Sequence, residues 1–300
     1  MTTEPHTSVE VFYSYAHEDE KLRDELKKHL SNLKRQGVIT DWYDRDISAG
    51  QEWDDEIKEH LNSAKVILLL EQAVEAARSA GGAWAVAMFS SHAAGIRLNR
   101  GEYDEARLTY QQALEAFKKL GAAENIAVCL HNLAKIAQHR RELDEARRLY
   151  NETLEMEKEL GYEEGLAATL HQLGLLAQDE GKQSEAQRLY NESLEIEKKL
   201  GNESGIAQSL HQLGNLSQER GETKDAQRLY NESLEIRKKL GDQDGIAGSL
   251  HQLGRLAEQD GNNEKAAQLF EEALAILERL KSPDAEIARR SLERVEGKSS

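Results

Sequence analysis

The sequence of 300 residues is poor in several residue types, and each shortage narrows the possible protein classes. A single cysteine, Cys129, rules out an internal disulfide and a zinc site built from several cysteines. Only two prolines are present and aromatic residues make up 5% of the chain, which favours long solvated helices over β structure. No apolar run approaches the length of a membrane span and no leader pattern is visible, so we expect a cytoplasmic protein.

Positive charge is also scarce. The chain has 39 basic and 55 acidic residues, which gives a net charge of −16. Phosphate binding depends on clustered Lys and Arg, and neither half of the chain carries a basic stripe. We therefore expect no nucleic-acid partner and no membrane partner.

The second half of the chain repeats itself every 40 residues. The block Arg-Leu-Tyr-Asn-Glu-Ser-Leu-Glu-Ile at 188–196 recurs unchanged at 228–236. The same interval separates the members of three series: His131, His171, His211 and His251; Tyr110, Tyr150, Tyr190, Tyr230 and Phe270; and Gly121, Gly161, Gly201 and Gly241. A period of this length indicates an array of small helical or strand units.

Each unit contains two helical patterns. In the unit that begins near Gly161, two apolar stripes with helical spacing are separated by Gly181, and the second ends before Gly201. The stripes consist of Leu166, Leu170, Leu173 and Ala177, then Ala186, Leu189, Tyr190 and Leu194. One hairpin cannot bury both stripes, whereas stacked hairpins can. We predict a mostly α-helical solenoid of five units over residues 82–280, with a capping helix over 283–296.

These units resemble the tetratricopeptide repeat (TPR) family, with a repeat longer than the commonest length. The matching residues of one unit are Leu170, Leu173–Gly174, Gly181, Ala186, Tyr190 and Ser193. The resemblance implies that the first helix of each unit lines a concave groove that binds a protein or peptide ligand. Carried over onto this chain, the groove residues are His131, Lys135, Gln138, His171, Gln178, His211, Asn215, Gln218, His251 and Arg255.

A second interpretation of the histidines remains open. They recur because the units were duplicated, and they support packing rather than binding. A metal site is not expected, because successive repeats lie about 10 Å apart whereas zinc–nitrogen bonds are about 2 Å.

The first seventy residues have a different pattern. Five elements are expected: a strand over Val9–Tyr15, a helix over about 18–35, a strand over Val38–Tyr43, a helix over about 53–61 and a buried strand over Val66–Leu70. Alternating strands and helices predict a parallel α/β sheet. We predict a small α/β domain over residues 8–70, after a disordered N-terminus at 1–7 and before a connecting helix at 71–81.

This stretch resembles part of a Toll/interleukin-1 receptor (TIR) domain. The matching residues are Val11-Phe12-Tyr13-Ser14-Tyr15, Trp42-Tyr43-Asp44-Arg45-Asp46-Ile47, Gly50 and Trp53. The resemblance implies a truncated, flavodoxin-like TIR fold. It also marks Tyr13, Trp42, Asp44, Arg45, Asp46 and Gly50 as a possible vestigial nucleotide or assembly surface, the alternative being core aromatics and a solvated turn.

Enzymatic members of the TIR family hydrolyse NAD⁺ with a glutamate on the helix after the third strand. Here Glu75 is the only nearby substitute, since no acid lies between it and Glu102. We therefore assign no catalytic residue and expect no cofactor. The leading prediction is a non-catalytic interaction scaffold or signalling adaptor; the alternative is a NAD⁺ hydrolase regulated by its TPR repeats, with NAD⁺ as substrate.

If the TIR-like sheet stops after Val66–Leu70, one edge of this apolar strand has no neighbouring strand. Two outcomes are expected as alternatives. Either Glu71–Phe89 continues as a helix and covers this region, or two chains associate through the exposed edge of the TIR-like part.

Overall fold

A computed structural model describes residues 9–13, 39–44, 64–79 and 81–297. The chain divides into two compact units, Met1–Ile57 and Lys58–Ser300. In the first unit, strands β1 (Val9–Tyr13) and β2 (Ile39–Asp44) pair in parallel, at the positions expected for the first two strands. The expected helices and residues 1–7 lie outside the described residues, so the flavodoxin-like domain stays a prediction.

The prediction of a third strand is wrong. Val66–Leu70 lies inside helix α3 (Ala64–Ser79). A short apolar run does not by itself distinguish a buried strand from a helix, and here it leads directly into alanine-rich, helix-favouring sequence. The strand edge that was expected to join two chains is therefore absent from this segment. The helix expected over Glu71–Phe89 is also interrupted, because α3 ends at Ser79 and the next helix begins at Ala83.

Five helix pairs come after α3. Their bounds are α4 Ala83–Asn99 and α5 Tyr103–Leu120; α6 Ala123–His139 and α7 Leu143–Leu160; α8 Glu163–Asp179 and α9 Gln183–Leu200; α10 Glu203–Glu219 and α11 Thr223–Leu240; α12 Gln243–Gln259 and α13 Asn263–Arg279. A final helix, α14 (Ala285–Glu296), packs against α13. Turns of only a few residues force consecutive helices to pack as antiparallel neighbours.

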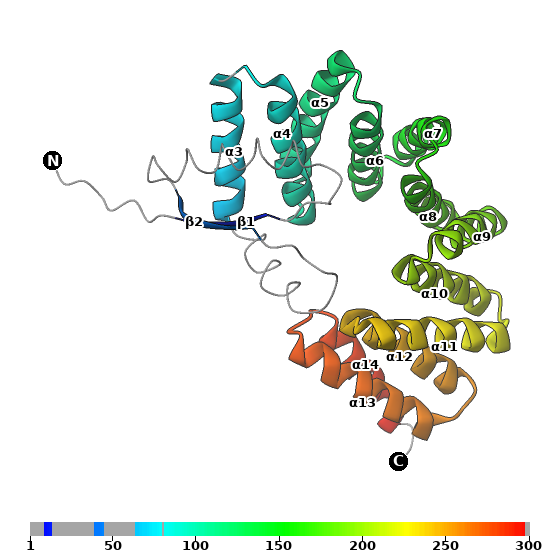
Figure 1. Ribbon diagram of the computed structural model, residues 1–300. Helices are drawn as coiled ribbons and strands as arrows, with labels where there is room; N and C mark the ends of the chain where they lie inside the picture. The colour runs from blue at the N-terminus through cyan, green and yellow to red at the C-terminus, as the bar shows by residue number, and fades with distance from the viewer. Residues whose placement is uncertain (1–8, 14–38, 45–63, 80, 298–300) are drawn as a thin grey trace. The chain divides into compact units, whose positions relative to one another are not determined.

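Within this unit the pairs stack in a curved row. Figure 1 shows α6, α8 and α10 on the inner side of the curve, with α7 and α9 outside them. First helices of successive pairs also touch, since α4 contacts α6 and α6 contacts α8. We call α4, α6, α8, α10 and α12 the inner helices and α5, α7, α9, α11 and α13 the outer helices.

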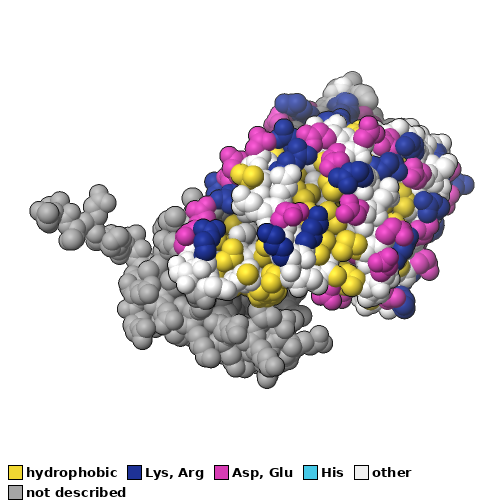
Figure 2. Space-filling model, turned by 90° about the horizontal axis from the view of Figure 1, so that it is seen from above, with side chains coloured by type: hydrophobic (Ala, Val, Ile, Leu, Met, Phe, Trp, Pro, Cys, Tyr) yellow, Lys and Arg dark blue, Asp and Glu magenta, His cyan; other side chains and the backbone are white. Residues whose placement is uncertain are grey.

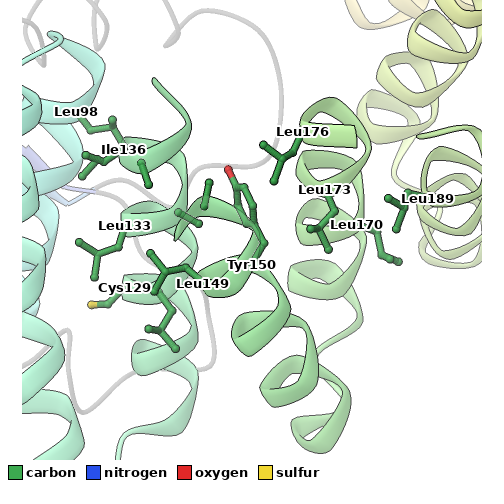
Figure 3. Packing of buried hydrophobic residues seen from close by; sticks show 14 of the residues in the cluster. Leu98, Cys129, Leu133, Ile136, Leu149, Tyr150, Leu170, Leu173, Leu176 and Leu189 are labelled. Atoms are coloured by element: carbon green, nitrogen blue, oxygen red, sulfur yellow. The ribbon is translucent and has the colours of Figure 1, made fainter. Parts of the chain in front are cut away.

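One hydrophobic core runs through several pairs. The tyrosine series Tyr150, Tyr190 and Tyr230 is fully buried, and Tyr150 lies between Leu133 of α6 and Leu173 of α8 (Figure 3). Each pair thus completes the core of its neighbour, because a single hairpin has no partner for its second apolar stripe.

Turns between helices rely on left-handed backbone conformations. At the end of α7, Gly161 has φ +66° and the N–H of Tyr162 donates to the carbonyl oxygen of Glu157 at 2.9 Å. The turns inside the third and fourth pairs place Gly181 and Gly221 at positive φ, whereas the second pair has Arg141 there, with φ +62°.

On the face shown in Figure 2, acidic and basic side chains are interspersed rather than gathered by sign. Some of them join neighbouring pairs: Arg147 of α7 binds Glu180 at 2.5 Å and Glu185 at 2.9 Å. Among the described residues, no helix is both long enough and apolar enough to cross a membrane.

Candidate functional site

The residues predicted to line the groove lie on one stripe of four inner helices. In α6 these are His131, Lys135 and Gln138, and the same positions recur in α8, α10 and α12. All of them are half-buried except Arg255, which is exposed. The stripe is therefore partly accessible, but its members differ in what they contact.

The four histidines pack against aromatic rings of the outer helices. His131 lies edge-on to Tyr150, with ring centroids 5.6 Å apart. The corresponding pairs His171–Tyr190, His211–Tyr230 and His251–Phe270 are tilted, with centroids 5.2–5.3 Å apart. The rings thus form part of each pair's own packing.

Two of the histidines also bond to the next helix in the row. His131 Nδ1 lies 2.9 Å from Thr169 Oγ1 of α8, and His251 Nε2 lies 3.1 Å from Ser291 Oγ of α14. Burial lowers the pKa of His131, His171 and His211 to about 4, and it also lowers the pKa of His251. These rings are therefore neutral near pH 7, and their contacts favour the packing interpretation over direct contact with a ligand.

The glutamines of the stripe connect neighbouring pairs. Tyr150 donates its hydroxyl hydrogen to Gln138 Oε1 at 3.1 Å, and Gln138 Nε2 donates to Asp179 of the next pair at 3.3 Å. Tyr190, Gln178 and Glu219 repeat this arrangement, with distances of 3.1 and 2.7 Å. A ligand would have to replace these hydrogen bonds rather than find free amides.

Of the remaining predicted residues, Arg255 and Lys135 are more available than Asn215, whose Oδ1 accepts a hydrogen bond from the Tyr230 hydroxyl at 2.7 Å. Arg255 is exposed and donates to Gln252 Oε1 at 3.1 Å, whereas Asn215 donates to Gln212 Oε1 at 2.7 Å. Lys135 is half-buried on the same stripe of α6. These side chains can present donors to a ligand on the inner side of the curve.

A second amide series, next to the histidines, was not predicted from the sequence. It consists of Asn132, Gln172, Gln212 and Gln252, one half-buried amide in each of four inner helices. The signal was visible, because an amide comes directly after the histidine at the same 40-residue interval in four of the five units. We call these four residues the amide row.

A buried position recurs near the end of each outer helix and is charged in the middle three. Phe117 and Leu277 occupy it in the first and last pairs, while Glu157, Glu197 and Arg237 occupy it in the middle three, with exposed fractions of 3%, 7% and 8%. Desolvation raises the pKa of Glu157 to about 7, and a hydrogen bond from Thr169 partly opposes this shift. These groups lie inside the row, away from solvent.

Three of the six candidates in the first unit lie on the described strands. The strand register sets Tyr13 opposite Asp44 and Val11 opposite Trp42, which brings three of the predicted residues to two adjacent strands. Arg45, Asp46 and Gly50 lie outside the described residues. Glu75, the possible substitute for a catalytic acid, lies on α3 with its side chain 68% exposed and paired with Arg78. This carboxylate is therefore exposed to solvent and is not enclosed in a pocket of the described residues.

Solved structures with a similar fold share little sequence with this chain. BtubC (BKLC) from P. vanneervenii matches with a TM-score of 0.63 and 22% identity, covering 73% of this chain and 93% of that one. The apo form of RapI matches with a TM-score of 0.62 and 18% identity, covering 91% and 75%. A Rap protein complexed with competence and sporulation factor gives 0.57 and 15%, covering 81% and 72%.

A curated relative is similar over a short stretch. The uncharacterized protein y4lF of Sinorhizobium fredii (strain NBRC 101917 / NGR234) is 56% identical over 63 residues, which is 21% of this chain and 20% of that protein. The chain thus matches about one fifth of the length of this relative.

Two family models match the chain. The TIR domain model matches residues 11–98, which extends the resemblance seen in the sequence through α3 and most of α4. The tetratricopeptide repeat model matches residues 84–159, 125–199 and 205–279, more than half of the chain. The chain belongs to the tetratricopeptide repeat family and carries a partial TIR domain at its N-terminal end.

Proposed function

We propose that the second unit binds an extended segment of a protein partner along the inner helices. The observation that carries this proposal is the amide row together with Lys135, Asn215 and Arg255, which places polar groups on each of the inner helices α6, α8, α10 and α12. A peptide in extended conformation needs donors and acceptors at regular intervals, and side-chain amides supply both. The Rap protein solved with competence and sporulation factor supports it as a similar fold seen with a bound factor.

The histidines have a supporting role in this proposal. Because all four pack on aromatic rings of the outer helices, and His131 and His251 also bond to the next helix in the row, they hold the inner helices at a fixed spacing. Their replacement should reduce stability first and binding only as a consequence.

The test is selection of a random peptide library on the full chain. Selected peptides should lose at least tenfold in affinity for a variant with Gln172→Ala, Gln212→Ala and Gln252→Ala. The matched control is Asn151→Ala, Asn191→Ala and Asn231→Ala, which removes three exposed amides from the outer helices. Equal affinity of the selected peptides for both variants would refute the assignment of the amide row.

The TIR match over residues 11–98 favours a second candidate, a NAD⁺ hydrolase whose TPR repeats sense a trigger. Incubation of the full chain with NAD⁺ and detection of nicotinamide tests it. Release that disappears in a Glu75→Gln variant would support the hydrolase. The scaffold proposal predicts no release.

A further inference from the structure

The solvent side of α5 differs from that of the next three outer helices. In α7, α9 and α11, an arginine pairs with the glutamate one turn later: Arg148–Glu152 at 3.2 Å, Arg188–Glu192 at 2.6 Å and Arg228–Glu232 at 2.8 Å. In α5 the same positions hold Leu108 and Gln112. Leu108 is 58% exposed, the largest fraction among the large apolar side chains that the structure describes.

A hollow lies beside this side of α5. Its volume is about 490 Å³, and its lining includes Gln112, Ala116 and Leu120 of α5 and Ala83 at the start of α4. The exposed Leu108 side chain is complementary to the partly apolar hollow. Within one chain it cannot enter the hollow, because the two lie at different positions along α5. They can meet only across two copies.

We propose that α5 packs antiparallel against α5 of a second copy of this chain, around a two-fold axis at Gln112. A two-fold interface must be self-complementary, so that each residue meets a counterpart on the other side of the axis. Residues equally distant in sequence from Gln112 face each other across the axis. Leu108 therefore faces Ala116 of the second copy and enters the hollow of that copy. Glu105 faces Lys119 of the second copy, and Gln112 faces its own equivalent.

The charges along α5 suit this arrangement. Glu105, Leu108, Gln112 and Lys119 are all exposed and lie on one stripe at helical spacing. The two Glu105–Lys119 pairs lie at the ends of the contact, where they remain solvated and set the register. Between these ends the stripe itself carries no charge, while Glu115, which also lines the hollow, is paired with Lys118. The Gln112 amide can both donate to and accept from its symmetry equivalent.

The other outer helices are unsuited to the same contact. An equivalent axis on α7 would place Glu145 opposite Glu159 of the second copy and Glu152 opposite itself. On α9 and α11 the axis would fall on Glu192 and Glu232, each of which is already paired with an arginine. Burying these charges would cost more than the contact returns. On α13 the axis would fall on Glu272 and place Lys265 opposite Arg279 of the second copy. The interface is therefore specific to the first pair.

A single pair of helix faces is small for a protein interface. Specific stable interfaces bury upwards of about 1,000 Å², and contacts near that size form weak complexes. We expect a dissociation constant in the micromolar range, about 10⁻⁶ to 10⁻⁴ M.

Sedimentation equilibrium of the full chain over a roughly hundredfold range of concentration tests the proposal. The wild-type chain should fit a monomer–dimer equilibrium, and Leu108→Arg with Gln112→Glu should weaken the dimer at least tenfold. Because that double change reproduces the surface of α9, circular dichroism should show unchanged helix content. Glu192→Gln in α9 is the control and should leave the dissociation constant unchanged.

A charge exchange identifies the geometry. Glu105→Lys and Lys119→Glu should each weaken self-association, because each places like charges opposite one another. An equimolar mixture of the two variants should restore the dimer, since both end pairs then become attractive. A wild-type chain that stays monomeric, a dimer that survives Leu108→Arg with Gln112→Glu, or a mixture no stronger than either variant alone would overturn the proposal.

Discussion

Two interfaces between helix pairs are built in the same way, but a buried side chain of opposite charge lies in each. Between α6/α7 and α8/α9, the buried position near the end of the outer helix is Glu157, and the Thr169 hydroxyl contacts both its carboxyl group and His131. Between α10/α11 and α12/α13 the same position is Arg237, which donates to the carbonyl oxygen of Gly245 at 2.6 Å. There His211 Nδ1 has no hydrogen-bond partner among the described residues.

The comparison shows that the helix packing is the same at both interfaces although the charge of the buried side chain differs. Duplication preserved the helix bounds and the histidine–tyrosine contact, with ring distances of 5.6 Å at one interface and 5.3 Å at the other. The buried charge changed freely, because the apolar Phe117 and Leu277 also fit that position. The two interfaces should therefore be similar in stability near pH 7 and differ when pH changes.

The largest effect is expected on acidification. The folded pKa of His131, His171 and His211 is about 4, below the reference value of 6.5. Their contribution to folding is complete above pH 6.5 and is lost as pH falls toward 4, by up to about 3 kcal/mol for each histidine. The urea midpoint, followed by circular dichroism, should fall steeply over this range.

The two interfaces should share this loss unequally. Each histidine has a positive neighbour, Lys135 beside His131 and Arg237 beside His211, but only His131 lies near a buried acid, Glu157, that can release its own proton. His211→Gln should therefore flatten the acid dependence of the urea midpoint more than His131→Gln does. Equal flattening would show that the charge of the neighbouring position is irrelevant.

The effect of Glu157 on stability should become visible at alkaline pH. Its folded pKa of about 7 lies above the reference value of 4.5, so its contribution is present below pH 4.5 and is lost as pH rises through 7. Glu157→Gln should raise the free energy of unfolding by about 2 kcal/mol at pH 8 and leave it nearly unchanged at pH 5. Arg237→Gln should lower the free energy of unfolding at both pH values, because the carbonyl oxygen of Gly245 loses its hydrogen-bond donor.

The hydroxyl groups should also differ between the interfaces. Thr169→Val removes a group that serves two buried partners and should cost about 1–3 kcal/mol. Ser249 Oγ lies 3.5 Å from Arg237, so Ser249→Ala should cost less than about 1 kcal/mol. Thr169→Ser keeps the hydroxyl and serves as the control. Similar urea midpoints for Thr169→Val and Ser249→Ala would contradict the assigned hydrogen bonds.

The smallest effect concerns the turns of the same two regions. Arg141 adopts φ +62° where Gly221 adopts φ +75°. A left-handed conformation costs a non-glycine residue about 1–2 kcal/mol, partly offset by the greater freedom of glycine in the unfolded chain. Arg141→Gly should therefore stabilise by up to about 1 kcal/mol, and Gly221→Arg should destabilise by a similar amount, both measured by thermal unfolding.

The helix pairs were predictable from the sequence, because two apolar stripes and their glycines recur at a fixed interval. The orientation of the histidines was not. Helical spacing identifies a stripe, but it does not say how much of that stripe the next pair covers. His131 lies at the border, where Thr169 of α8 contacts it, so a residue carried over as groove-facing packs between pairs instead.

The prediction of a third strand failed for a related reason. Val66–Leu70 has the composition of a buried strand, but a short apolar run takes its secondary structure from its neighbours, and the alanines after Leu70 extend the segment into α3. That helix packs on α4 in the way that each outer helix packs on the next inner helix, a role that the TIR resemblance gave no reason to expect.

Residues 84–98 are matched by both family models, and they form most of α4. The two modules therefore share a helix rather than a linker. Any truncation inside this stretch removes part of both modules. Recombination that replaced the repeats by another repeat array would have to retain α4, because the TIR-like part also needs it.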